Sequence, residues 1–383
     1  MRRGTTVLAA AVALVGALLT GGAASAAPAP ALPDGSAASA AAIPPQFARV
    51  LAGQHVIYSY SGPTPPPALF DAVRAGEAAG VVFFSDNIVS LDQIRGVAQD
   101  LQDAAMMSPI PVPLLLLTDQ EGGQVRRLRL PGADGPAASA SRVGAAADPA
   151  AAGSRTGHEA ASALRTAGLN GNLAPVLGVH RAPGDFLDAY GRSYSSDPAV
   201  VAAAVGAFIG AQQADGIAAT AKHFPGLGAA PAGANTDEEP VTIPLDAGTL
   251  RNVDEAPYRA AIAAGVDMIM PSWAVYPALD PGAPAGLSSA ILRGDLRGNL
   301  GYQGVIVSDA IEAGALAAFG DAGDRSVAAL AAGQDLALCS SRDAAQGAQA
   351  TGDLAAAITG GRLNLGDVLA STERVLALRL SLQ

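Results

Sequence analysis

Eight short apolar runs recur along this chain, and alanine-rich segments with the period of a helix separate them. A short apolar run of this kind indicates a buried strand. Strands that alternate with helical segments pair in parallel, and eight such units are the number that closes a (β/α)8 TIM-type barrel. We therefore predict a single-domain α/β barrel whose strands cover residues 55–60, 80–84, 113–118, 169–177, 217–223, 266–272, 305–309 and 335–340.

The first 45 residues are predicted to precede that barrel. Arg2 and Arg3 come before an apolar stretch over 7–19, and Ala24-Ser25-Ala26 has the small residues of a cleavage site, so residues 1–26 indicate a secretory signal. An uncleaved membrane anchor is the alternative. Residues 27–45 consist mostly of Ala, Pro and Ser, which cannot form a core, and we expect a flexible leader there. The barrel domain is then 46–383, and we expect the protein to be secreted.

Charge excludes several kinds of partner. The formal net charge is −11, and loss of Arg2 and Arg3 with the signal leaves 21 basic against 34 acidic residues, a net charge of −13. Nucleic acid and anionic membranes are poor partners for such a surface. The single cysteine, Cys339, lies in an apolar run and is expected to be a buried structural thiol. We expect a monomer without metal or cofactor, because the sequence has no His and Cys cluster and no phosphate-binding loop.

Polar side chains follow several of the predicted strands, and the carboxyl ends of strands are where barrel enzymes place their catalytic groups. Strand three runs into a polar segment that begins at Asp119, strand five ends in Lys222-His223, strand six in Ser272-Trp273 and strand seven in Ser308-Asp309. Lys222 is the only lysine in the chain. Carboxylates and cations around an apolar barrel suit the hydroxyls of a sugar, so a carbohydrate is the expected ligand. Taken alone, Asp309 is also compatible with an N-cap of a helix over 310–316.

Five motifs, in order, resemble those of glycoside hydrolase family 3 and its single-domain members similar to bacterial β-N-acetylglucosaminidases. The resemblance covers about residues 46–380 and is carried by Asp119-Gln-Glu-Gly-Gly-Gln-Val-Arg-Arg127, Asn172-Leu-Ala-Pro-Val176, Gly191-Arg-Ser-Tyr-Ser-Ser-Asp-Pro198, Lys222-His-Phe-Pro-Gly226 and Val305-Ile-Val-Ser-Asp309. It implies a retaining mechanism in which Asp309 is the nucleophile and forms a covalent glycosyl-enzyme. It also implies that the sugar is held by Asp119, Arg127, Arg192, Lys222 and His223. For the two arginines, a surface ion pair is the alternative.

The chain departs from this family in the loop after Lys222-His223. The related acetylglucosaminidases have a histidine as general acid and base in an Asp-Ser-His triplet, whereas this chain has Asn235-Thr236-Asp237 and no histidine between Gly226 and Pro240. A loop carboxyl group with a raised pKa can do the same work, and Asp237 occupies roughly the place of the histidine. A solvated acidic loop is the alternative. We also expect Trp273 to be exposed at the barrel mouth and to stack on a sugar face.

The sequence therefore predicts a secreted retaining glycoside hydrolase that acts on terminal β-linked sugars, with N-acetylglucosamine from cell-wall or chitin fragments as the leading candidate. Two alternatives stay open. Loss of the loop histidines is also what a catalytically impaired, glycan-binding relative would show. The altered loop is equally compatible with a β-glycosidase of other specificity or with a transglycosidase, because a weak base slows hydrolysis.

Overall fold

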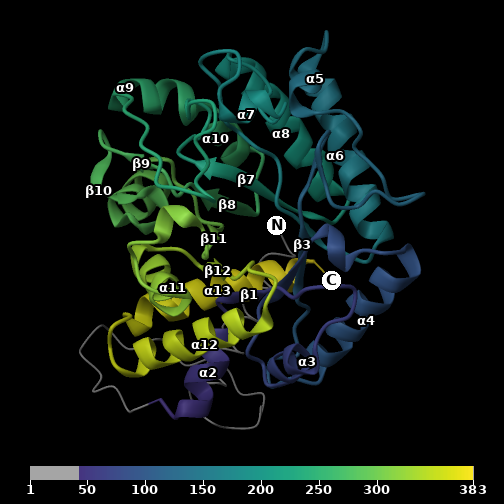
Figure 1. Ribbon diagram of the computed structural model, residues 1–383, viewed down its shortest axis with the longest axis vertical. Helices are drawn as coiled ribbons and strands as arrows, with labels where there is room; N and C mark the ends of the chain where they lie inside the picture. Colours follow the sequence, from purple (N-terminus) through teal and green to yellow (C-terminus); the bar gives the residue numbers. More distant parts are fainter. Residues whose placement is uncertain (1–42, 383) are drawn as a thin grey trace, which may run out of the picture.

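The computed structural model describes residues 43–382, in which the eight predicted strands form a closed barrel (Figure 1). Every neighbouring pair in the barrel is parallel. Their order is β1-β12-β11-β8-β7-β6-β3-β2, so strands that follow one another along the chain lie side by side and the last closes against the first. The strands are β1 (Val56–Tyr58), β2 (Gly80–Phe83), β3 (Leu115–Thr118), β6 (Gly171–Asn172), β7 (Ala218–Phe224), β8 (Met268–Pro271), β11 (Val305–Ala310) and β12 (Leu336–Leu338).

Helices surround the barrel, and several begin at a polar residue whose side chain accepts a hydrogen bond from the first turn, among them Ser90, Asp148, Asp197, Asp321 and Asn364. The longer helices are α2 (Pro45–Gly53), α3 (Pro67–Arg74), α4 (Leu91–Met106), α6 (Pro149–Thr166), α8 (Pro198–Ala214), α10 (Ala256–Ala263), α11 (Ala322–Ala332), α12 (Ala344–Thr359) and α13 (Leu365–Ser381). The other helical segments are α5 (Ala140–Gly144), α7 (Phe186–Ala189), α9 (Ala247–Thr249), the 3-10 turns Ser85–Asn87, Ala285–Leu287 and Gly314–Leu316, and the π-helices Leu250–Asp254 and Ala290–Asn299.

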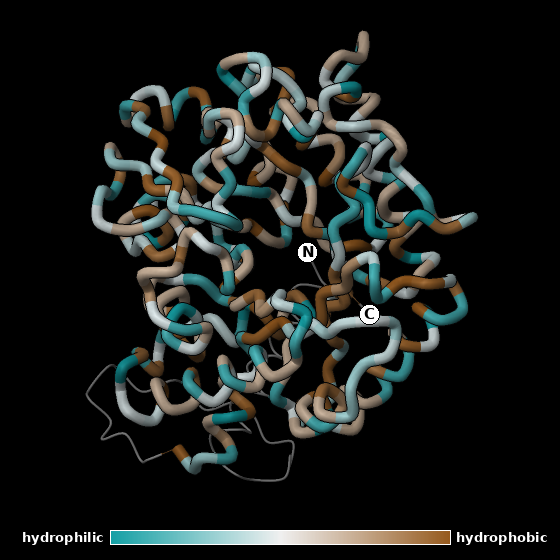
Figure 2. Tube along the Cα trace, in the orientation of Figure 1, coloured by the Kyte–Doolittle hydropathy of each residue, from teal (hydrophilic) through white to brown (hydrophobic). Residues whose placement is uncertain are grey.

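Side chains that point into the barrel fill it, as expected for strands with apolar residues on both faces. Figure 2 shows hydrophobic stretches along the strands near the centre of the molecule. The buried side chains inside the barrel include Ile57, Val82, Leu115, Leu117, Met268, Val305, Val307 and Leu336. The barrel is therefore a packed core, and a ligand can bind only at one of its ends. Cys339 is fully buried, as predicted.

The fourth predicted strand, residues 169–177, is shorter than expected. Only Gly171–Asn172 pairs as a strand, although Leu173 N still donates to Thr118 O and Leu177 N to Lys222 O. The apolar run continues past the strand because the segment beyond it stays buried between its neighbours. Pro175 has no N–H to donate to a regular ladder.

The predicted signal, residues 1–26, and residues 27–42 of the predicted leader lie outside the described residues. Within residues 43–382, no helix combines the length and the apolar character needed to cross a bilayer. Two hairpins lie beside the barrel: β4 (Gln120–Gly122) with β5 (Val125–Arg126), and β9 (Val275–Tyr276) with β10 (Asp280–Pro284). The first of them follows β3 directly and contributes to the site described next.

Candidate active site

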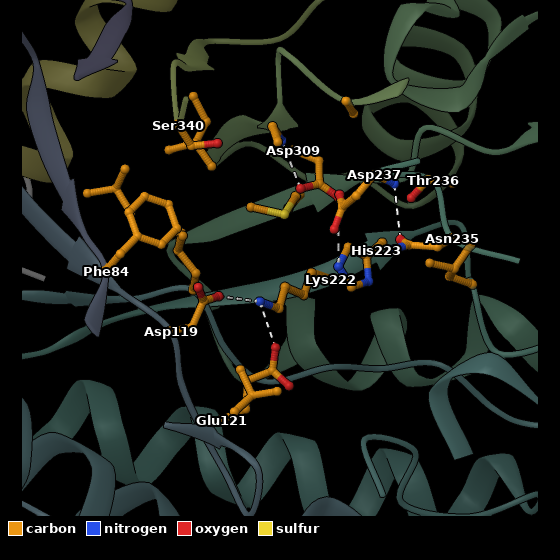
Figure 3. A pocket seen from close by; sticks show the side chains of 18 of the residues that line it. Phe84, Asp119, Glu121, Lys222, His223, Asn235, Thr236, Asp237, Asp309 and Ser340 are labelled. Atoms are coloured by element: carbon orange, nitrogen blue, oxygen red, sulfur yellow. Dashed lines mark hydrogen bonds and ion pairs between the residues drawn. The ribbon is translucent and has the colours of Figure 1, made fainter. Parts of the chain in front are cut away.

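A pocket of about 320 Å³ opens at the carboxyl ends of the strands, within the size range of small-molecule sites. Asp119 enters it directly after β3, Lys222 and His223 come from β7, Asp309 comes from β11, and Asp237 comes from the loop after β7 (Figure 3). Arg127 and Arg192 also line it. The structure thus brings together seven of the eight residues that the sequence proposed for the site.

Lys222 is the centre of a buried charge network. Its Nζ lies 2.8 Å from Asp119 Oδ1 and 2.8 Å from Glu121 Oε1, and its side chain is only 4% exposed. Arg192 binds Glu121 through two parallel hydrogen bonds of 2.9 Å, and Arg127 lies 3.4 Å from Asp119. Two carboxylates therefore face three cations, and the carboxylates stay ionised.

The pKa values of the network follow from these contacts. Burial alone would raise the pKa of Glu121, but Arg192 and Lys222 outweigh burial and lower the pKa to about 2. Burial likewise opposes ionisation of Asp119, yet Lys222 and Arg127 lower its pKa. Burial alone would lower the pKa of Lys222, but Asp119 and Glu121 outweigh burial and raise it. The network presents fixed donors and acceptors to a neutral, hydroxyl-rich ligand.

His223 is a neutral imidazole beside the carboxylate of Asp309. Burial lowers its pKa well below the usual value, and the positive charges of Lys222 and Arg192 lower it further. Its Nε2 lies 3.8 Å from Asp309 Oδ2, and its buried Nδ1 has no hydrogen-bond partner within residues 43–382. The ring can therefore hydrogen-bond a hydroxyl group without adding charge.

Asp309 and Asp237 form a pair of carboxyl groups at the pocket (Figure 3). Burial raises the pKa of Asp309 to about 7, and the negative charge of Asp237 contributes to the rise. The pKa of Asp237 is also raised, first by the protein atoms that surround its carboxyl group and then by Glu312, although Arg192 opposes the rise. Asp237 is solvent-exposed and lines the pocket, so its carboxyl group can reach a ligand there. Two interacting carboxyl groups of this kind titrate as a pair and can share one proton.

The helix-cap alternative for Asp309 is wrong. Asp309 lies within β11, its Oδ1 accepts a 2.8 Å hydrogen bond from Ala310 N, and the next helical turn begins only at Gly314. The solvated-loop alternative holds for the neighbours of Asp237, because Glu238 and Glu239 are exposed and do not line the pocket.

The expectation that Trp273 is exposed and stacks on a sugar is wrong. Its side chain is fully buried, and its Nε1 donates a 2.9 Å hydrogen bond to Ala310 O. The indole packs so closely on Gly286 that a Cβ there would lie 2.3 Å from the ring. Trp273 therefore bonds to the last residue of β11 from within the core and does not line the pocket.

Sequence reasoning missed several residues that line the pocket: Phe84, Glu121, Glu312, Ser340 and Arg342. Glu121 could have been found, because it lies two residues after Asp119 and side chains alternate along a hairpin strand. The guanidinium of Arg342 lies over the ring of Phe84, 4.8 Å from its centre. Within residues 43–382, no group of three or more His, Cys, Asp or Glu side chains is arranged to hold a metal ion.

The chain is similar to several known proteins. Residues 68–378 match the family model described as the glycosyl hydrolase family 3 N-terminal domain. A protein of Arthroderma benhamiae described as an uncharacterized secreted glycosyl hydrolase is 44% identical over 332 residues, which are 86% of this chain and 92% of that protein. A β-hexosaminidase of Pseudomonas aeruginosa is 37% identical over 278 residues, 72% of this chain and 79% of the relative.

A solved structure is also similar. The family 3 β-N-acetylglucosaminidase of a Paenibacillus species superposes with a TM-score of 0.81 at 34% identity, over 87% of this chain. The match spans 62% of the Paenibacillus chain, so the present chain corresponds to less than two thirds of that protein.

Proposed function

Because the chain belongs to glycoside hydrolase family 3, we propose that it is a secreted, retaining β-N-acetylhexosaminidase that removes terminal β-linked N-acetylglucosamine from cell-wall or chitin-derived glycans. The observation that carries the proposal is the carboxyl pair Asp309 and Asp237 beside a charged network suited to sugar hydroxyls. The names of the related hexosaminidases support the choice of sugar. The secreted relative and the predicted signal at residues 1–26 support export.

The proposed reaction has two steps. In the first, Asp309 attacks the anomeric carbon while Asp237 donates a proton to the departing glycosidic oxygen. In the second, Asp237 removes a proton from water, and the water attacks the glycosyl-enzyme from the opposite side to that taken by Asp309. Two inversions give net retention.

The first step needs one proton on the carboxyl pair, placed on Asp237; the second step begins with Asp237 ionised, because that proton has left with the departing group. In the free site the pKa of Asp309 is about 7, so the shared proton also resides on Asp309. The positive charge that develops on the sugar ring favours the ionised form of Asp309 and moves the proton toward Asp237. The charge network meanwhile holds the ring: Asp119 and Glu121 accept hydrogen bonds from hydroxyl groups, and Lys222 and Arg192 donate them.

A panel of nitrophenyl β-glycosides tests the proposal. We expect the N-acetylglucosaminide to have the highest kcat/KM, and proton NMR to show the β-anomer of the sugar as the first product. An α-anomer as the first product would overturn the retaining mechanism. Binding of the sugar without turnover of any glycoside, with or without added azide or formate, would instead identify a glycan-binding protein.

Substitution of Asp237 by alanine should separate substrates by their leaving groups. A poor leaving group needs protonation, so its kcat should fall by about 10²- to 10⁴-fold, whereas an activated dinitrophenyl glycoside should keep a fast first step. Azide should then restore turnover of the activated substrate, because this anion attacks the glycosyl-enzyme without a general base. Glu239→Ala is the matched control, since this exposed neighbour does not line the pocket. Equal losses on both substrates without rescue by azide would exclude the role.

A further inference from the structure

The segment that follows Asp309, residues 310–316, is bonded to the loop that carries Asp237. Gly314 N donates to Asp237 O at 2.8 Å, and Ala315 N donates to Thr236 O at 3.1 Å. The backbone of the proposed acid/base residue is therefore attached to a segment that starts one residue after the proposed nucleophile. Two adjacent hydrogen bonds of this kind fix both the place and the direction of the loop.

Gly314 is the point of closest approach between the two segments. A Cβ at this position would lie 2.1 Å from Glu238 O and 2.4 Å from Glu238 C, distances at which the backbone must move. The φ angle of Gly314 is outside the left-handed region, so an alanine there is compatible with its own backbone. Alanine would thus act only by pushing away the loop that carries Asp237.

Glu312, in the same segment, lines the pocket together with Asp237. Its carboxylate accepts hydrogen bonds from Ser340 Oγ at 2.5 Å, from Ser340 N at 3.2 Å and from Gln346 Nε2 at 3.1 Å. Three donors hold the carboxylate in one orientation. Burial raises the pKa of Asp237, Glu312 and Asp119 raise it further, and Arg192 and Lys222 lower it. Asp237 in turn raises the pKa of Asp309.

From these contacts we infer that residues 310–316 form a positioning element, in which Gly314 sets the place of the Asp237 carboxyl group and Glu312 keeps that group able to donate a proton. The inference rests on the proposed acid/base role of Asp237. It explains how one short segment coordinates both reacting carboxyl groups: its first residue, Ala310, ends β11 directly after Asp309, and Gly314 and Ala315 hold the loop that carries Asp237.

Gly314→Ala is the first test. We expect kcat on a substrate with a poor leaving group to fall by about 10- to 100-fold with KM unchanged, because a displacement near 1 Å disables proton transfer without removing the sugar-binding groups. The kcat/KM on the dinitrophenyl glycoside should change by less than about threefold. Gly96→Ala in α4 is the matched control, since a Cβ there meets nothing within 4 Å, and it should leave both activities unchanged.

Glu312→Gln is the second test and decides the matter if Gly314→Ala does not fold. Glutamine keeps the shape of the side chain and an acceptor for Ser340, but it removes the charge. The alkaline limb of the kcat/KM profile should move to lower pH, because Asp237 then loses its proton more easily, while kcat at the acidic side is kept.

Two outcomes would overturn the inference: equal losses on both substrates for Gly314→Ala, or an alkaline limb that Glu312→Gln leaves in place. The Asp237→Ala variant tells this failure from failure of the proposed function. If Asp237→Ala separates the two substrates and Gly314→Ala does not, only the positioning role is wrong. If Asp237→Ala does not separate them, the acid/base assignment itself is wrong and the positioning role falls with it.

Discussion

Asp309→Asn should lower turnover by about 10³- to 10⁶-fold on every substrate, activated or not, while the fold is kept. Asparagine has nearly the same volume and still accepts the hydrogen bond from Ala310 N, but its amide cannot attack an anomeric carbon. The loss should be the same for good and poor leaving groups, in contrast to that of Asp237→Ala. Steady-state kinetics on the two kinds of glycoside check this, and wild-type turnover of the variant would show that Asp309 is not the nucleophile.

The same substitution should raise stability at neutral and alkaline pH. The folded-state pKa of Asp309 is about 7, above its ordinary value, so the stability that this group contributes is fully present at acidic pH and is lost as pH rises through about 7. For a single group, each unit of difference between the folded-state pKa and the ordinary pKa corresponds to about 1.4 kcal/mol of unfolding free energy. We expect the melting temperature of Asp309→Asn to exceed that of the wild type at pH 8 and to equal it near pH 4.

Asp267→Asn is the matched control for that comparison. Burial raises the pKa of Asp267 to about 6, and this residue precedes β8 at the end of the barrel away from the pocket. It should show the same kind of pH-dependent stabilisation with full activity. If Asp309→Asn were instead destabilising at pH 8, the fold would stabilise the ionised carboxylate of wild-type Asp309, and its pKa would not be raised.

The sequence predicted the barrel well because a parallel strand that is buried on both faces has a continuous apolar run. Such a run can be recognised without knowing which strands lie beside it. All eight runs correspond to barrel strands. The exception in length, residues 169–177, shows the limit of that signal: a buried segment that has left the ladder is as apolar as one within it. Hydropathy reports burial and does not report pairing.

The pocket was predictable only where its residues lie at a strand end. Asp119, Lys222, His223 and Asp309 are placed by the parallel strands themselves, whose carboxyl ends meet on one side. Glu312 depends on the turn after β11, and Trp273 depends on the direction in which the chain leaves β8. Gly286, which makes room for the indole, is remote from Trp273 in the sequence and gave no local signal. Side-chain direction beyond a strand end is a tertiary property.

Lys222→Met should weaken sugar binding and also destabilise the fold. Methionine has a similar length but no charge and no donors, so hydroxyl groups lose a charged partner worth about 1.5–3 kcal/mol, and kcat/KM should fall by about 10- to 100-fold or more. Because Lys222 joins Asp119 and Glu121 in a buried site, its loss also leaves these two carboxylates facing each other. Removal of one partner from such a buried network typically costs about 3–5 kcal/mol. The midpoint of thermal or urea unfolding measures that cost.

The double variant Lys222→Met with Glu121→Gln separates the two effects, because it restores the balance of charge without restoring the ammonium. Glutamine can still accept a hydrogen bond from Arg192, so the pocket keeps its second cation in place. We expect the double variant to recover much of the lost unfolding free energy and none of the lost sugar affinity. Recovery of affinity would mean that Lys222 serves to neutralise Glu121. An unchanged melting temperature in Lys222→Met alone would mean that Arg127 and Arg192 suffice to hold both carboxylates, and that the single lysine of the chain serves the ligand alone.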